Sequence, residues 1–228
     1  MKKHYFTSSA LTYFRQLEKN NHRDWFEANK HRYESCVREP FQALIADLAG
    51  PLAKISPHFV ADPRKQGGSL FRPYRDARFS KDKTPYKTAA GARFFHQRSK
   101  QVPAPSFYLH IAPDDFFIGG GIWHPEPDTL KRLRAFLEEN PAAWAKATQS
   151  KRFAARYEFF GESLSRAPRG IDPAHPLIED LKRKNLAAGA ALIEADVLGD
   201  GLHAIVIDHF KSLAPLIDYL CAALDLEF

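Results

Sequence analysis

The sequence predicts an α+β protein, in which an antiparallel-rich mixed sheet carries helices packed on it from the N-terminal and C-terminal parts of the chain. Apolar residues recur at helical spacing near both ends, whereas residues 57–123 form short aromatic and aliphatic runs divided by glycine, proline and charge. The 228 residues are 44% hydrophobic and 26% charged, a composition typical of globular domains. Because no internal repeat and no long linker interrupts the pattern, we predict a single domain over residues 1–228.

Three helices are predicted in the first third of the chain. Leu11, Phe14 and Leu17 follow one another at helical spacing behind Ser8 and Ser9, which are candidate N-caps. A second helix opens at a capping-box pattern, and a third opens at a proline and is expected to kink at a Gly-Pro pair. The residues that define these two helices are Asp24, Trp25, Phe26, Glu27, Tyr33, Val37, Pro40, Gly50 and Pro51.

The middle of the chain predicts strands at residues 69–74, 88–96, 105–111 and 115–123. Pro113 and the two aspartates after it separate the last two strands, which favours an antiparallel hairpin. Three glycines at residues 119–121 precede Trp123. Glycines permit close backbone approach, either by a ligand or by a neighbouring helix or strand.

The second half of the chain predicts mixed elements. Asp128 is a candidate cap for one helix, and Asn140 followed by Pro141 ends it and opens the next. Beyond these we predict, in order, a strand near residues 153–160, a loop at 165–173, a helix across 176–185, a strand near 190–197 and a closing helix across 203–224.

The net charge of +6 is concentrated in one part of the chain. Residues 64–100 contain 11 lysines or arginines against two acids, a local net charge of +9, whereas residues 185–228 contain seven acids and one base. A basic block of this kind raises the local concentration of anionic partners. The alternative is a solvated face, offset by contact with the acidic C-terminal part of the chain.

Residues 70–87 carry the strongest chemical signal. Arginine offers a planar fork to phosphate or carboxylate oxygens, lysine offers a mobile point charge, and short hydroxyl residues complete the shell of an oxyanion. We therefore predict an anion-binding loop whose cations are Arg72, Arg75, Arg78, Lys81, Lys83 and Lys87. The supporting residues are Tyr74, Asp76, Ser80, Thr84, Tyr86, Trp123 and His124.

Within this loop, Asp76 is the expected counter-ion that orients Arg75 and Arg78, because neighbouring cations lower the pKa of a carboxyl and make it a poor general base. Pro73 and Pro85 argue against a regular helix and for a rigid loop. Stacking of a base or sugar is the role expected of exposed aromatic residues here, and the candidates are Tyr74, Phe79, Tyr86 and Trp123. If proton transfer occurs, its candidate groups are His96, His124, Asp76 and Tyr86.

Several motif classes are excluded. The glycines at residues 199 and 201 fit a dinucleotide fingerprint, but too little chain follows for the second strand and its acidic residue. No P-loop, nucleophile elbow, zinc-protease or EF-hand spacing occurs. We predict no metal site, because His110, Asp114, Asp115 and His124 would converge only if their strands pair favourably.

The chain has two cysteines, Cys36 and Cys221, which are expected to be buried thiols. This cysteine content fits a reducing, cytoplasmic location. The N-terminal region is too polar for the apolar core of a signal peptide, and the apolar stretch at residues 116–123 is too short to span a bilayer. We therefore expect a cytoplasmic protein without a membrane partner.

Several blocks of the sequence resemble the bacterial and fungal proteins classed as domain of unknown function 2461. The matching blocks are FTSSALTYFRQLEKNNHRDWFEANKHRYE, RDARFSKDKTPYK, GGGIWHP, LSRAPRG and HPLIEDLKRKN. Together they span nearly the whole chain. The resemblance implies a single α+β domain of about this length. It supplies no activity, cofactor or catalytic residue.

Three functions compete on the sequence alone. The first is binding of a phosphorylated small molecule or a nucleotide by the loop at residues 72–87. The second is binding of nucleic acid by the same basic and aromatic segment, with steep salt dependence, although a net charge of only +6 argues against a large footprint. The third is a non-catalytic structural or interaction domain, whose basic block pairs with the chain's own acids.

Overall fold

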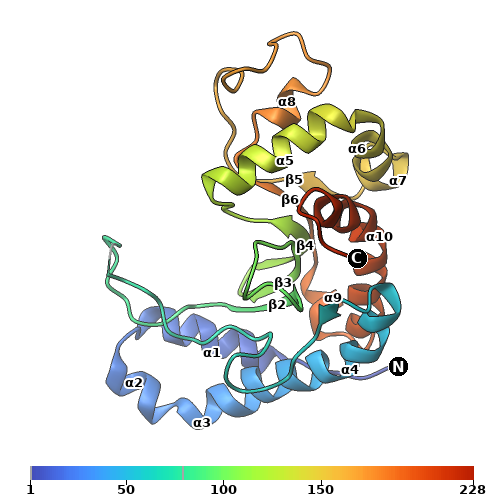
Figure 1. Ribbon diagram of the computed structural model, residues 1–228. Coiled ribbons are helices and arrows are strands. Elements are labelled where there is room, and N and C mark those ends of the chain that lie inside the picture. The colour runs from blue at the N-terminus through green and yellow to red at the C-terminus, as the bar shows by residue number, and fades with distance from the viewer. Residues whose placement is uncertain (1, 79) are drawn as a thin grey trace.

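The computed structural model describes residues 2–78 and 80–228. Its centre is a six-stranded antiparallel sheet in the order β1-β2-β3-β4-β6-β5 (Figure 1). The strands are β1 (Phe59–Val60), β2 (Ala90–His96), β3 (Ser106–Ala112), β4 (Asp115–Ile122), β5 (Glu158–Phe159) and β6 (Leu186–Ala191). The helices are α1 (Ser8–Lys19), α2 (Arg23–Ala28), α3 (Lys30–Tyr33), a π-helix (Glu34–Arg38), α4 (Glu39–Ile55), α5 (Pro127–Glu139), α6 (Pro141–Thr148), α7 (Lys151–Ala154), α8 (Ile178–Leu181), α9 (Glu194–Leu198) and α10 (Leu202–Ala222). The α+β class predicted from the sequence is confirmed.

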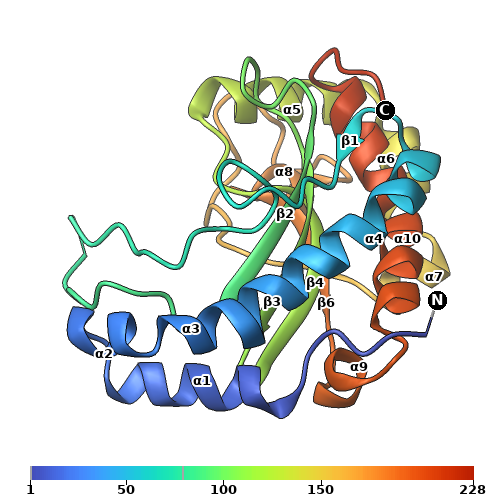
Figure 2. The same ribbon diagram turned by 90° about the horizontal axis from the view of Figure 1, so that it is seen from below.

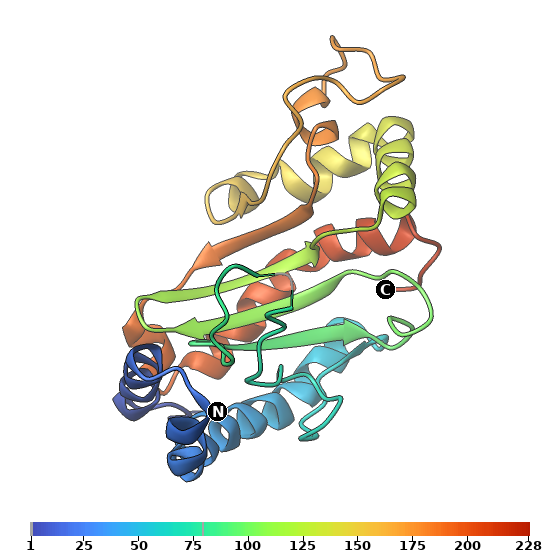
Figure 3. The same cartoon turned by 90° about the vertical axis from the view of Figure 1, so that its left-hand side faces the viewer.

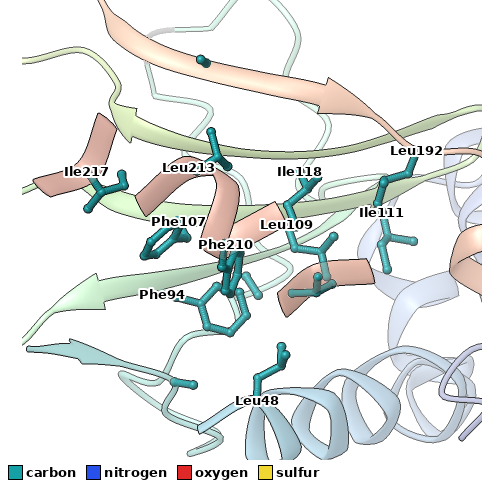
Figure 4. Close-up of a cluster of buried hydrophobic side chains, with 14 of the residues drawn as sticks. Leu48, Phe94, Phe107, Leu109, Ile111, Ile118, Leu192, Phe210, Leu213 and Ile217 are labelled. Atoms are coloured by element: carbon teal, nitrogen blue, oxygen red, sulfur yellow. The ribbon is translucent and has the colours of Figure 1, made fainter. Parts of the chain in front are cut away.

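One face of the sheet carries the core. Alternate residues of the central strands point to this face and pack under α10, with α4 beside it (Figures 2 and 4). These side chains are at most 1% exposed; they are Phe94, Phe107, Leu109, Ile118, Phe210, Leu213 and Ile217. Since fully burying a large apolar side chain contributes about 1.5–3 kcal/mol, this layer supplies much of the driving force for folding.

The hairpin of β3 and β4 is confirmed. Tyr108 of β3 lies opposite Gly119 of β4, and Ala112 lies opposite Asp115 at the turn. Asp114, between the two strands, has a φ of 62°, a left-handed conformation that aspartate tolerates better than most residues. The glycine run also pairs with β6, where Gly119 lies opposite Gly189. The strand β6 makes the close approach at Gly119 and Gly121, whereas at Gly120 the nearest atom to an added Cβ is Cδ1 of Ile217 in α10, at 3.1 Å.

The first helices form where the apolar spacing predicts them, but their caps differ. Ser8 and Ser9 lie inside the first turn of α1, and Thr7 holds the N-cap position without a side-chain hydrogen bond to the helix. The capping box predicted at Asp24 is wrong, because Nδ1 of His22 accepts the hydrogen bond from a backbone N–H in the first turn of α2. Asp24 instead stands in that first turn, where its charge complements the helix dipole.

The π-helix joins α3 directly to α4, so the second and third predicted helices merge into a run from Lys30 to Ile55. Pro40 lies in the first turn of α4 but inside this continuous run, where it cannot donate the backbone hydrogen bond that other residues there can make. The helix continues through Gly50 and Pro51. None of the helices within residues 2–78 and 80–228 has both the length and the hydropathy needed to cross a bilayer.

The second half of the chain contains most of the wrong element predictions. The strand expected near residues 190–197 is β6 at Leu186–Ala191, and the residues after it begin α9. The segment near residues 153–160 is the short helix α7 followed by only two strand residues, and the predicted helix across 176–185 shortens to α8. Residues 69–74 form isolated bridges and no strand. The closing helix α10 is confirmed within two residues at each end.

A buried histidine couples the stability of the fold to pH. His209 of α10 is 5% exposed, and its Nδ1 lies 3.0 Å from the hydroxyl of Tyr157. Burial is the main cause that lowers the pKa of His209 from 6.5 to about 4, and the neighbouring charge of Arg156 adds to it, whereas Asp208 and Asp196 act in the opposite direction. The folded state therefore favours the neutral imidazole.

This shift predicts a loss of stability in mild acid. Between pH 6.5 and pH 4 the unfolded chain binds a proton at His209 that the folded chain does not, so the free energy of unfolding falls as the pH is lowered through this window. The His209 contribution to the loss is on the order of 2–3 kcal/mol. Urea denaturation at a series of pH values measures it. His209→Gln keeps a polar partner for Tyr157. Between pH 6.5 and pH 4 its unfolding free energy is expected to fall by about that much less than the unfolding free energy of the native chain.

The native protein has to be compared with His209→Gln, because burial also lowers the pKa values of His96 and His110 and these residues add to the pH dependence. The paired carboxylates, such as Asp47 and Asp208, have lowered pKa values and lose their contribution only as the pH falls through those values. Equal pH dependence of the native chain and His209→Gln would contradict the assignment to His209.

Candidate anion-binding site

Residues 70–88 leave the edge of the sheet beside β2 and return to it as a two-stranded ribbon, which we call the basic arm. Leu70 forms a bridge with Ala92 of β2, and Tyr74 forms a bridge with Tyr86 within the arm. The backbone N–H of Lys87 donates to the carbonyl of Pro73 at 2.7 Å. Figures 1 and 2 show the arm projecting from the body beside α1 and α2. The expected rigid loop is thus a paired ribbon.

Aromatic contacts anchor the root of the arm. The ring of Tyr86 stacks on Phe26 of α2 at 3.9 Å between centroids and 8° between planes. The side chain of Asn21 accepts a hydrogen bond from the N–H of Tyr86 at 3.0 Å and donates one to its carbonyl at 2.9 Å. Tyr86 is 3% exposed, and burial raises the pKa of its hydroxyl. Of the two tyrosines proposed for stacking with a ligand, only Tyr74 is exposed.

Two acids of the arm hold its outer part together. Asp82 accepts hydrogen bonds from the N–H and hydroxyl of Thr84 at 2.9 and 3.0 Å, and it pairs with Arg75. The Thr84 N–H and then the Arg75 side chain lower the pKa of Asp82 to about 2. Asp76 binds Arg78 through both carboxylate oxygens, at 2.9 and 2.7 Å. Asp76 is therefore the counter-ion of Arg78, as expected, while Arg75 pairs with Asp82.

The remaining residues of the outer arm have different surroundings. The ammonium of Lys83 donates to the carbonyls of Ala77 and Arg78 at 3.0 and 3.3 Å. Lys81 is exposed to solvent, and Ser80 is partly exposed. Phe79 lies outside the described residues. Arg75, Arg78 and Lys83 of the outer arm thus use these contacts to stabilise the ribbon.

The base of the arm carries two further cations, Arg72 and Lys87. The Lys87 ammonium lies 5.2 Å from the ring centroid of Phe71, and its side chain is only partly exposed. Burial and then the charge of Arg72 lower the pKa of Lys87. Among the described residues, both ion pairs within the arm belong to Arg75 and Arg78, and no carboxylate lies within 4.0 Å of the charged groups of Arg72 or Lys87. Lys87 is therefore partly desolvated, and neither cation has an ion pair within 4.0 Å among the described residues, although Asp76 interacts with Arg72 at longer range.

A small cavity adjoins this base. Its volume is about 100 Å³, and its lining includes Phe71, Arg93, Phe95 and Lys100. Arg93 and Lys100 extend the positive region, and neither is among the site residues predicted from the sequence. The signal for Arg93 was its alternation with the buried Phe94 along β2, which places Arg93 on the opposite face of the sheet. None of the six predicted cations lines this cavity or the other described cavity, beside α6, α7 and α10.

Trp123 and His124 lie away from the arm. They follow β4, which β3 separates from β2 in the sheet. Trp123 is 52% exposed and contacts Phe160 at 5.5 Å between centroids. His124 has a φ of 50°, and its N–H donates to the side-chain oxygen of Asn185 at 2.7 Å. The structure does not bring these two residues to the same cavity as the arm.

The histidines and cysteines of the described chain lie in separate surroundings. His110 pairs with Asp115 at 3.6 Å, whereas Asp114 pairs with Arg15. His96 is 1% exposed, and its Nε2 lies 3.0 Å from a backbone carbonyl near the C-terminus. Within residues 2–78 and 80–228 no group of three or more histidine, cysteine, aspartate or glutamate side chains is placed to hold a metal ion. Cys221 is buried as expected, and Cys36 is partly buried.

The acidic C-terminal part does not neutralise the basic arm. Asp208 pairs with Arg152 and Arg156, and Asp225 pairs with Arg132. The arm instead uses its own two acids, which leaves its base positive. Among the described residues, no ion pair joins the basic block to the C-terminal acids. The interpretation in which these acids offset the block therefore has no support from ion pairs.

These features define an α+β protein whose antiparallel sheet packs under helices on one face and carries a basic arm at one edge. The chain belongs to the family described as Conserved hypothetical protein (DUF2461), whose model matches residues 9–219. The matched range includes the sheet, the basic arm and most of α10. No curated protein and no solved structure matches the chain significantly.

Proposed function

We propose that this protein binds a phosphorylated ligand, either a small molecule or a nucleotide, at the base of the basic arm. The observation that carries the proposal is the pair of cations Arg72 and Lys87, of which Lys87 is partly buried against Phe71 with no acidic partner among the described residues. A desolvated ammonium beside a second cation raises the free energy of the unbound protein. A phosphate group between them removes this repulsion and gains hydrogen bonds assisted by charge.

The outer arm has a second role in this proposal. Arg75, Arg78 and Lys83 use their hydrogen bonds to hold the ribbon, so the arm keeps Arg72 and Lys87 in one geometry. A preorganised site loses less conformational entropy when it binds. Lys81, which is exposed, adds positive charge that attracts an anion from a distance.

Removing the charge of either basal cation is expected to weaken binding of phosphorylated ligands. Hydrogen bonds to charged groups contribute about 1.5–3 kcal/mol, so Arg72→Gln and Lys87→Gln are each expected to lower the affinity by roughly 10- to 150-fold. The panel of ligands is inorganic phosphate, pyrophosphate, mononucleotides and sugar phosphates. A thermal-shift screen finds the ligand that stabilises the folded state, and titration calorimetry measures its affinity.

Lys151→Gln is the matched control, because Lys151 is an exposed lysine in α7, which lies far from the arm in Figures 1 and 2. It removes the same net charge without touching the arm. If Lys151→Gln weakened binding as much as Lys87→Gln, the effect would come from net charge alone. An absence of binding across the whole panel would instead favour the non-catalytic structural or interaction domain.

A further inference from the structure

The second face of the sheet is not covered by α4 or α10. In Figure 3 this face is turned to the viewer, and the segment that leads into the basic arm passes in front of it. The strand pairing places Tyr108 and His110 of β3, and Phe117 of β4, on this face, opposite to the core side chains. We call it the open face.

Aromatic side chains form a continuous path across the open face. The ring centroid of Phe71 lies 6.0 Å from that of Tyr108, which lies 5.6 Å from Phe117. Phe160 continues the path at 6.3 Å from Phe117, and it lies 5.5 Å from Trp123. His110 stacks on Phe117 at 4.7 Å with 16° between the ring planes. We call these six side chains, Phe71, Tyr108, His110, Phe117, Phe160 and Trp123, the aromatic platform.

Glycines let some of these rings approach the backbone. A Cβ atom added at Gly91 would lie 2.2 Å from the hydroxyl of Tyr108, and one at Gly189 would lie 2.8 Å from the ring of Phe160. Packing of aromatic rings over glycines also stabilises sheets, so this contact alone does not indicate a ligand. The exposure of the ends of the path is the stronger indication. Phe71, Phe160 and Trp123 are 41%, 37% and 52% exposed, and Tyr108, His110 and Phe117 between them are partly exposed, unlike the buried aromatic residues of the core.

Positive charge borders the platform on one side. Lys87 lies over Phe71, and Arg93 of β2 shares the open face with Tyr108, which it pairs with across the strands. Near the other parts of the platform, Asp114 pairs with Arg15 and Glu162 pairs with Lys184. Asp115 lies 3.6 Å from His110, whose pKa is lowered by burial, so no cation offsets this acid in that pair. Glu158, on the edge strand β5, is an exposed acid on the side away from β2. The β2 edge therefore favours phosphate groups. The aromatic surface across the strands favours flat, neutral groups.

We infer that the open face binds single-stranded nucleic acid, whose bases stack on the aromatic platform while its phosphates contact Arg72, Lys87 and Arg93. This inference rests on the proposed phosphate site at the base of the arm and extends it across the sheet. A single strand exposes the faces of its bases, which a duplex keeps stacked inside, and aromatic side chains accept any base because every base has a π face. The basic edge favours a strand with a phosphate at each nucleotide over a neutral carbohydrate.

The test measures binding of an oligouridine of about eight nucleotides, within the usual site sizes for such surfaces, by fluorescence anisotropy. Phe160→Leu and Trp123→Ala are each expected to weaken binding by roughly 5- to 150-fold, the effect of losing one stacked base. Phe160→Leu keeps an apolar side chain and removes only the ring. Ile193→Ala is the matched control, since Ile193 is an apolar side chain that is 65% exposed and lies outside the platform. It is expected to leave the affinity unchanged.

Salt dependence and an abasic strand separate this inference from the proposed phosphate site. Each phosphate contact contributes about 0.7 to the slope of the logarithm of affinity against that of salt concentration for single strands. Arg72→Gln is expected to reduce this slope, whereas Phe160→Leu is expected to leave it unchanged. An abasic strand of the same length is expected to bind weakly, and its affinity should be insensitive to Phe160→Leu.

The outcomes are distinguishable. If the oligouridine and the abasic strand bind equally well and the platform variants bind like Ile193→Ala, the inference is overturned. A loss of pyrophosphate binding in Arg72→Gln would leave the phosphate site standing in that case. If Arg72→Gln binds every phosphorylated probe like the native chain, the phosphate site itself is wrong. Preference for a duplex over the single strand would also overturn the inference.

Discussion

Replacing Phe107 by alanine is expected to destabilise the protein by about 3–5 kcal/mol, because it removes a large ring from the centre of the core and leaves a cavity. Phe107 of β3 is 0% exposed. Its ring lies 4.6 Å from Phe210 of α10 and 5.4 Å from Phe59 of β1, measured between centroids (Figure 4). The substitution therefore removes contacts both to the helix that covers the sheet and to its edge strand. Urea denaturation measures the loss of unfolding free energy.

Phe71→Ala is the matched control for this prediction. It deletes the same type of side chain from the basic arm, where Phe71 lies against the open face of the sheet and is 41% exposed. We expect the free energy of unfolding to fall by less than about 1 kcal/mol, which is typical of substitutions away from the core. Similar losses in the two variants would mean that the two faces of the sheet do not differ as described.

Replacing Gly121 by alanine is expected to cost about 2–5 kcal/mol, because it combines backbone strain with a clash. Gly121 has a φ of 135°, a conformation that residues with a side chain rarely adopt. A Cβ atom there would lie 2.1 Å from the carbonyl oxygen of Leu186 and 2.5 Å from the Cα of Ala187, both in β6. The strands would have to separate, with an overpacking cost added to that of the strain. Thermal and urea denaturation both measure the effect.

Gly170→Ala separates the two causes. Gly170 also has a positive φ, of 88°, but no atom lies within 4 Å of an added Cβ. In this variant the loss of unfolding free energy should come from backbone strain alone and be about 1–2 kcal/mol. An equal loss in both variants would show that the close approach of β6 contributes nothing. Because Gly121 lies on the open face, Gly121→Ala is also expected to disturb the nearby end of the aromatic platform.

The elements that the sequence predicted correctly are those with a strong local pattern. The helices α1 and α10 repeat apolar residues at helical spacing. The strands β2, β3 and β4 contain aromatic residues, β3 and β4 also contain isoleucine, and a clear turn separates these two. In such segments each residue's preference and its place in the core agree. Local reasoning is therefore sufficient there.

The strand β6 could not be predicted in this way. Its sequence, LAAGAA, consists of small residues that favour a helix or no regular structure when considered alone. It becomes a strand because β4 offers Gly119, Gly120 and Gly121, and two strands of small residues can pair closely. The prediction placed the strand a few residues later, where α9 forms. The partner that decides the structure lies more than 60 residues earlier in the chain.

The features of the candidate site can likewise be separated into those that the sequence predicts and those that depend on the tertiary structure. The sequence by itself determined the α+β class, the amphipathic helices, the hairpin of β3 and β4, and the concentration of cations at residues 72–87, because these depend on residue type and local spacing. Only the tertiary structure decided that Arg75 pairs with Asp82 and not with Asp76, and that Arg72 and Lys87 have no carboxylate within 4.0 Å among the described residues. It also decided that aromatic side chains from β3, from β4, from the residues directly after β4 and β5, and from the arm meet on one face of the sheet. The pairing of Arg75 depends on how the arm folds back on itself, and the aromatic arrangement depends on contacts between residues far apart in the chain. Local patterns contain neither kind of information.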